Sequence, residues 1–214
     1  MEKVNYEKIM QKKIQEIEKY GVRPKLLLHI CCAPCSSGVI EELFNYFDIT
    51  VFFYNPNISY KEEYLKRIEE LNRFITKKEL KIKILEGRYD PQKDFFEKVK
   101  GLEKEKEGGK RCYECYKLRL DETAKVAKEN GFDYFTTVLS ISPLKNATWI
   151  NEIGKELQNK YDIEFLYSDF KKKGRYQKSI VESKKYELYR QDYCGCIFSK
   201  LEREKYKKEK EENN

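Results

Sequence analysis

Five short apolar runs alternate along this chain with longer segments of helical periodicity. The runs are Lys25–His29, Ile49–Tyr54, Lys81–Leu85, Tyr134–Leu139 and Ile163–Leu166. Short apolar runs separated by helices are typical of buried strands that right-handed crossovers connect. The alternation therefore predicts an α/β fold built around a mostly parallel sheet.

The helical segments divide the chain into three parts. Residues 1–23 predict an N-terminal helical extension, residues 24–199 an α/β domain that ends in a basic appendage, 168–199, and residues 200–214 a charged tail, frayed or disordered. Within the domain we expect helices over Ser36–Phe47, Ser59–Thr76, Asp90–Lys100, Cys112–Asn130 and Asn146–Tyr161. The second of these begins with a capping box of Ser59 and Glu62, and its inward residues are Tyr64, Leu65, Ile68 and Leu71.

All seven cysteines fall into three short groups. The first group is Cys31, Cys32 and Cys35, the second is Cys112 and Cys115, and the third is Cys194 and Cys196. A buried structural cysteine usually occurs singly in an apolar run, where it behaves as a small hydrophobic residue. Clustering of every cysteine therefore indicates thiolate ligands of a metal or a redox-active dithiol.

The composition argues against several other classes of protein. The sequence has no apolar stretch of about 18–20 residues and no signal-peptide core, so it predicts a cytoplasmic protein without a membrane partner. An odd number of cysteines in such a chain argues against a disulfide framework. The single histidine, His29, nearly excludes hydrolysis at a histidine-rich zinc site and is the one candidate base for a Ser-His-Asp triad.

The cysteines also occupy the place where an open α/β sheet binds its ligand. The first group follows the first strand, Asn55–Asn57 follows the second and Ser140–Pro143 follows the fourth, so all three are expected at one crevice. No glycine-rich phosphate loop follows the first strand, which argues against nicotinamide and ATP binding. His29, next to the first group, either serves a metal site or ends its strand with a satisfied imidazole.

Residue spacing leaves the metal open. Cys112 and Cys115 lie one helical turn apart, and Cys31 and Cys32 could complete an iron–sulfur site with four thiolates. The third group would then be a redox dithiol or, with Cys35, a second metal site. A structural zinc ribbon of Cys32 and Cys35 with the second group explains the spacing equally well.

Most of the net charge of +7 lies between residues 171 and 190, which contain eight basic and two acidic residues. The same segment carries Tyr176, Tyr186 and Tyr189. Lys and Arg neutralise phosphates, and tyrosine rings offer stacking faces for unpaired bases, so this pattern indicates RNA binding; the alternative is a solvated helix face. The candidate RNA-binding residues are Lys171, Lys172, Lys173, Arg175, Tyr176, Lys178 and Arg190.

Five motifs in order resemble those of the QueH family, the cobalamin-independent epoxyqueuosine reductases. They are Leu26–Cys35, Phe53–Ile58, Glu107–Cys115, Leu139–Pro143 and Phe170–Cys196. The last motif contains most of the basic segment and the third cysteine group. Together the motifs span nearly all of the predicted domain. At Cys35 some family members carry Asp, which fits a metal ligand and argues against a mechanism that strictly needs this thiolate.

The resemblance implies a Rossmann-like fold similar to the adenine-nucleotide α-hydrolase group and a [4Fe-4S] cluster. The implied reaction is the reduction of epoxyqueuosine to queuosine at the wobble position of tRNA, the last step of queuosine biosynthesis. Carried over residue by residue, Cys31, Cys32 and the second group would bind the cluster. The third group, with Cys35, would be catalytic, as a redox pair or as ligands of an adjacent mononuclear iron. The implied partners are the anticodon stem-loop of tRNA and an unidentified electron donor.

Two other functions fit some of these features. A cluster-containing, ATP-dependent tRNA thiolase would use a related fold, but the glycine-rich loop is missing here. An RNA-binding protein stapled by zinc would use the cysteines for structure alone.

Overall fold

The centre of the protein is a five-stranded, all-parallel sheet with the strand order β3-β2-β1-β4-β5. The computed structural model describes residues 4–212. Its strands are β1 (Lys25–His29), β2 (Asp48–Phe53), β3 (Lys83–Glu86), β4 (Tyr134–Thr137) and β5 (Glu164–Phe165). The predicted Rossmann-like α/β fold is confirmed.

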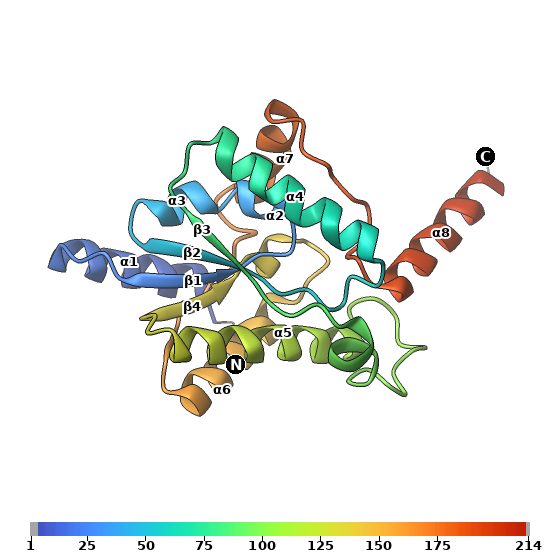
Figure 1. The fold of residues 1–214 in the computed structure, drawn as a ribbon, viewed down its shortest axis with the longest axis horizontal. Coiled ribbons are helices and arrows are strands. Elements are labelled where there is room, and N and C mark those ends of the chain that lie inside the picture. Colours follow the sequence, from blue (N-terminus) through green and yellow to red (C-terminus); the bar gives the residue numbers. More distant parts are fainter. Residues whose placement is uncertain (1–3, 213–214) are drawn as a thin grey trace.

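Helices cover both faces of this sheet (Figure 1). On one side lie α2 (Ala33–Ser37), α3 (Ile40–Phe44) and α4 (Lys61–Lys77), and on the other α5 (Lys110–Glu129) and α6 (Ala147–Tyr161). The remaining helical elements are α1 (Tyr6–Tyr20), the π-helix η1 (Gln92–Phe96), the 3-10 helix η2 (Val138–Ile141), α7 (Arg175–Lys185) and α8 (Ile197–Glu212). Because both faces of the sheet are covered, the consecutive residues Leu26, Leu27 and Leu28 of β1 are all buried.

The N-terminal extension packs against the domain. The side chain of Asn5 caps α1 by accepting a hydrogen bond from the Lys8 backbone N–H, and Gly21 ends the helix in the left-handed conformation. The apolar stripe of the helix, formed by Met10, Ile14 and Ile17, is buried as its periodicity predicts.

One predicted helix, Ser36–Phe47, is divided into α2 and α3. The interruption lies at Gly38, where a Cβ atom would collide with the carbonyl oxygen of Arg175. Glycine therefore lets the backbone of α7 approach closely, and this tertiary contact shapes the turn.

Two local predictions are wrong, and a third is right only in part. The capping box does not form, because α4 begins after Tyr60 and Ser59 Oγ instead accepts a hydrogen bond from the backbone N–H of Ile197. Leu65 is 43% exposed, since the buried face of α4 is narrower than expected. The short helix expected over Asp90–Lys100 is a single π-helical turn, η1.

The C-terminal segment has two different halves. Phe170 and Arg175 are buried, so the first half packs onto the domain. The charged tail, in contrast, is a regular helix that projects from the body (Figure 1). Within residues 4–212, no helix combines the length and the apolar character that crossing a membrane requires.

Candidate metal and active site

The carboxyl ends of β1, β2 and β4 lie level at the centre of the sheet. His29 ends β1 and pairs in register with Phe52 of β2 and Thr137 of β4. From β1 the chain first builds one side of the sheet and later the other, which makes this the switch point where such sheets bind ligands. A cavity of about 430 Å³ opens here and is lined by Cys31, Cys32, Cys35 and Cys194, among others.

The first cysteine group lies where β1 passes into α2. The Sγ atoms of its three cysteines all lie within 4.8 Å of one another. Pro34, in the first turn of α2, helps to begin the helix directly after the strand, so a short turn brings the thiols together. This grouping differs from the assignment by resemblance, which placed Cys35 with the third group; the ligand set itself stays a prediction.

The three thiols of the first group have different pKa values. Contacts with the Cys32 and Cys35 side chains hold the pKa of Cys31 well below its usual range. The same contact with Cys31 raises the pKa of Cys32 to about 11. Cys31 is therefore the most acidic thiol of the group, and metal binding would require the other two thiols to lose their protons.

Long-range contacts hold the third group. The Sγ atoms of Cys194 and Cys196 lie 3.5 Å apart, and Gly195 between them has a φ of 113° that favours glycine. Ser59 donates its backbone N–H to the Gly195 carbonyl at 3.1 Å. The Arg67 guanidinium, 1% exposed, donates to the carbonyl of Cys194 at 3.2 Å. The loop is thus clamped to the segment that follows β2.

The second group lies next to the third. Cys115 shares a small apolar cluster with Cys196, Phe95 and Val99. The backbone N–H of Gly108 donates to Cys112 Sγ at 3.2 Å, and that of Ser199 donates to Cys196 Sγ at 3.4 Å. Each donor lowers the pKa of its thiol, but burial of Cys112 and the contact of Cys196 with Cys194 outweigh this and raise both pKa values.

Buried positive charge accompanies the thiols. Arg119 is 3% exposed, and its Nε donates to the Cys115 carbonyl at 3.0 Å. No carboxylate within residues 4–212 forms an ion pair with it. Burial lowers the pKa of Arg119, but the charges of Cys115, Cys31 and Cys194 outweigh this and raise it. An unpaired buried guanidinium fits a site that holds negative charge when it is loaded.

Lys145 adds a second cation, from the turn before α6. It lines the cavity, and although burial opposes its charge, the thiols of Cys31, Cys194 and Cys35 raise its pKa. Sequence reasoning identified neither Lys145 nor Arg119. A signal existed for Arg119 only, since it stands four residues after Cys115 on the same helix and so shares its face.

His29 is a structural residue of the strand end. Its Nε2 donates to the carbonyl oxygen of Tyr54 at 3.1 Å, which leaves Nδ1 to accept from the hydroxyl of Thr137 at 2.8 Å. That hydroxyl in turn accepts the backbone N–H of Leu139 at 3.2 Å. Burial lowers the pKa of His29 to about 4, so the imidazole is neutral and both ring nitrogens are satisfied.

The predicted RNA-binding residues separate into two sets. Tyr176 and Arg190 line the cavity, with the guanidinium 5.8 Å from the ring centroid. Lys171 donates to the carbonyls of Ser140 and Lys145, while Lys173 and Lys178 pair with glutamates.

Arg175 is a correction to the predicted set. Its guanidinium is 2% exposed and forms hydrogen bonds with both Glu7 and Glu42. It therefore ties α7 to α1 and α3 and is not available to RNA. The sequence hid this role because its two partners lie 168 and 133 residues away.

A family model for the epoxyqueuosine reductase QueH matches residues 26–202, which is most of the chain. The chain belongs to the QueH family. The resemblance seen in the sequence is thus confirmed, and the chain is an enzyme of the oxidoreductase class.

Curated QueH proteins match over nearly the same region. The epoxyqueuosine reductase QueH of Staphylococcus epidermidis is 46% identical over 205 residues, covering 94% of this chain and 86% of the relative. That of Streptococcus pyogenes is 44% identical over 202 residues, covering 92% and 79%. The QueH of Thermotoga maritima is 38% identical over 178 residues, covering 83% and 91%.

Proposed function

We propose that this protein reduces epoxyqueuosine to queuosine at the wobble position of tRNA, with an iron–sulfur cluster bound by its cysteines. The observation that carries the proposal is the match to QueH reductases over a chain in which four of the seven thiols line one cavity. The net reaction consumes two electrons and two protons. Both C–O bonds of the epoxide break, an alkene forms and the oxygen leaves as water.

The donor set fits an anionic metal–thiolate centre. All seven cysteines are free thiols, and buried Arg119 has no carboxylate to balance it. Cys31, Cys32, Cys112 and Cys115 would hold a [4Fe-4S] cluster, which when bound supplies the single-electron transfers of the reduction. Cys194 and Cys196, with Cys35, would form the catalytic redox pair or hold a mononuclear iron. The proximity of Cys35 to Cys31 and Cys32 supports a second site that borders the first.

The remaining polar residues of the cavity suit a strained cyclic ether. Lys145 supplies an N–H donor and a positive charge opposite the thiols, where the epoxide oxygen gains negative charge as its bonds break. Glu107 also lines the cavity, and its carboxylate accepts a hydrogen bond from Ser199 Oγ at 3.0 Å. Burial raises the pKa of Glu107, so this carboxyl retains a proton to a higher pH than an exposed glutamate.

The rim of the cavity suits a nucleotide that has left its stack. The Tyr176 ring offers a stacking face, and the Arg190 guanidinium offers a phosphate contact beside it. An anticodon loop presents its wobble base unpaired, so that base can enter a cavity without melting a duplex.

Two measurements test the proposal. tRNA from a reductase-deficient bacterial strain that expresses this gene would be digested and analysed by nucleoside mass spectrometry, and we expect queuosine in place of epoxyqueuosine. Unconverted epoxyqueuosine beside folded, cluster-loaded protein would contradict the activity. Iron, sulfide and zinc would be quantified after anaerobic purification, and we expect about four or more irons per chain. Zinc near one equivalent without iron would favour the zinc-stapled RNA-binding protein.

A further inference from the structure

Helix α8 projects from the body of the protein (Figure 1), and its residue Arg203 lines the cavity. Ser199, near its start, is its only buried residue, and every residue from 201 to 212 is exposed. This exposed part is about 18 Å long at about 1.5 Å per residue. Isolated helices of this size are marginal in water, and in proteins packing usually stabilises them. Residues 201–212 lack such packing, so the helix calls for another explanation.

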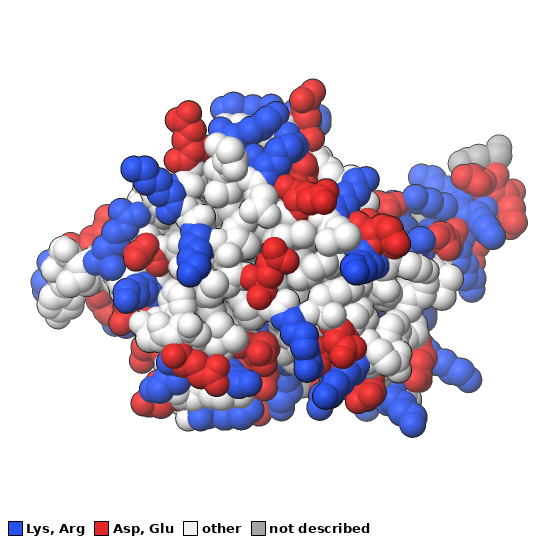
Figure 2. All heavy atoms as spheres, viewed as in Figure 1, with Lys and Arg blue, Asp and Glu red and all other residues white. Residues whose placement is uncertain are grey.

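The basic residues of α8 are not spread evenly around the helix. Lys200, Arg203, Lys207 and Lys210, here called the α8 stripe, fall within a sector of about 80° at about 100° per residue. Figure 2 shows both charge signs on the projecting helix, and because they nearly balance, its net charge is small. Four of the six basic residues of α8 thus share one sector, with Glu204 and Glu211 at its edge.

The two sides of the helix have different neighbours. Glu202 lies away from the stripe, where it pairs with Arg111 at 2.9 Å and accepts the backbone N–H of Glu107 at 3.0 Å. On the stripe, Arg203 lines the cavity, and Asp192 at the cavity rim accepts from both Arg203 and Lys207. The stripe thus starts at the cavity and continues outward along the helix.

We propose that the α8 stripe binds phosphates of the tRNA whose modified base occupies the cavity. This inference rests on the proposed function, because it takes its ligand from that reaction. A base that enters the cavity remains attached to its strand, so the phosphates on either side of it must pass close to the rim. The stripe offers several cations along the path that leads away from the rim, and cations at phosphates supply most of the sequence-independent affinity for nucleic acid.

An acidic electron-donor protein is the competing partner for a basic surface. Electron donors can approach a buried centre from any side that is close enough, whereas the strand that carries the substrate base must cross the cavity rim. Continuity between the stripe and the cavity through Arg203 therefore favours RNA.

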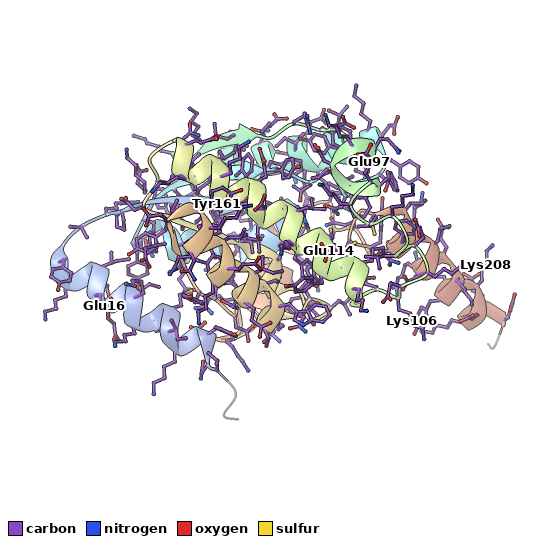
Figure 3. All side chains as sticks on the ribbon, turned by 90° about the horizontal axis from the view of Figure 1, so that it is seen from below. Glu16, Glu97, Lys106, Glu114, Tyr161 and Lys208 are labelled. Carbon is purple, nitrogen blue, oxygen red and sulfur yellow. The ribbon has the colours of Figure 1, made fainter. Side chains whose placement is uncertain are left out.

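The test compares two double variants of the full chain on the same helix. The stripe variant is Lys207→Gln with Lys210→Gln, and the control is Lys205→Gln with Lys208→Gln, which removes the same charge from the other side. Figure 3 shows Lys208 on the projecting part of α8. Binding of an unmodified tRNA transcript with guanosine at the wobble position would be measured by fluorescence anisotropy over a series of salt concentrations.

We expect the stripe variant to bind about tenfold more weakly and its salt slope to fall by about two, while the control stays within about twofold of the unaltered protein. Circular dichroism would establish that both variants keep their helix content. Equal affinities for the two variants would overturn the inference. Unchanged RNA affinity with lost reduction by a protein donor would assign the stripe to that donor instead. If the unaltered protein binds no tRNA, the proposed function fails and the inference fails with it.

Discussion

The first cysteine group and Cys194 of the third group line one cavity, but the two groups are positioned in opposite ways. The first is built by its own neighbours in sequence, since β1 ends at His29 and α2 begins at Ala33. The third lies in a loop that is held by Arg67, which is 127 residues from Cys194, and by Ser59. Half of the site is thus part of the sheet scaffold, and the other half depends on a tertiary clamp.

This difference has a chemical consequence. Each group contains one thiol whose pKa is lowered by its neighbours, Cys31 in the first and Cys194 in the third. Cys31 is buried, whereas Cys194 is partly exposed to the cavity. The scaffold group therefore suits permanent metal ligation, and the clamped group suits contact with a substrate.

The largest expected effect separates the two groups by metal content. Replacing Cys31 and Cys32 together by Ala should remove the iron–sulfur cluster entirely. Replacing Cys194 and Cys196 together by Ala should keep most of the cluster absorbance but abolish reduction of epoxyqueuosine. Iron and sulfide analysis with the visible spectrum measures both outcomes. Complete loss of the cluster in the second variant would show that the two groups share one set of ligands.

The next effect tests the clamp. Arg67→Met should lower turnover on the order of 100-fold, because it releases the loop of the third group by enough to misplace its thiols. It should also lower the free energy of unfolding by about 3 kcal/mol, since the pair of buried Arg67 with half-buried Glu63 is broken. Lys61→Met at the exposed start of the same helix is the control. Turnover and urea unfolding measure the two effects, and unchanged turnover would show that the clamp does not position the site.

A smaller effect concerns the charge that accompanies the thiols. Arg119→Gln should lower the reduction potential of the bound cluster by on the order of 50 mV, because a nearby cation stabilises the more negative, reduced state. Arg119→Lys should restore much of the lost reduction potential. Lys117→Gln, on the exposed side of α5, should leave the potential unchanged. A redox titration monitored by electron paramagnetic resonance measures the reduction potential of each variant. A potential in Arg119→Gln equal to that of Lys117→Gln would exclude this electrostatic role.

The smallest effect ranks the thiols of the metal-free protein. Near neutral pH, iodoacetamide should modify Cys194 before Cys115, because the low pKa of Cys194 leaves it ionised while burial raises the pKa of Cys115 to about 11. The rate at Cys194 should fall only as the pH drops through its lowered pKa, and the rate at Cys115 should rise as the pH increases toward 11. Peptide mass spectrometry gives both rates. Faster modification of Cys115 would reverse this ranking.

Much of the fold was predictable from local patterns. The strands were predicted to within a few residues of their ends, because apolar runs of strand length bounded by breakers depend little on the rest of the chain. The errors lie where a distant segment intervenes. Ser59 has the right spacing for a capping box, but its hydroxyl accepts the Ile197 N–H. The start of α7 packs against Gly38, near the beginning of the predicted helix Ser36–Phe47.

The same division applies to the site. The sequence alone determined that the cysteines are clustered and that the first group follows the first strand of a parallel sheet, because spacing along the chain is local information. Only the tertiary structure decided that Arg119 is buried without a carboxylate and that Arg175 forms ion pairs with Glu7 and Glu42. Burial and charge pairing depend on residues more than a hundred positions apart, and no local pattern records which of them meet.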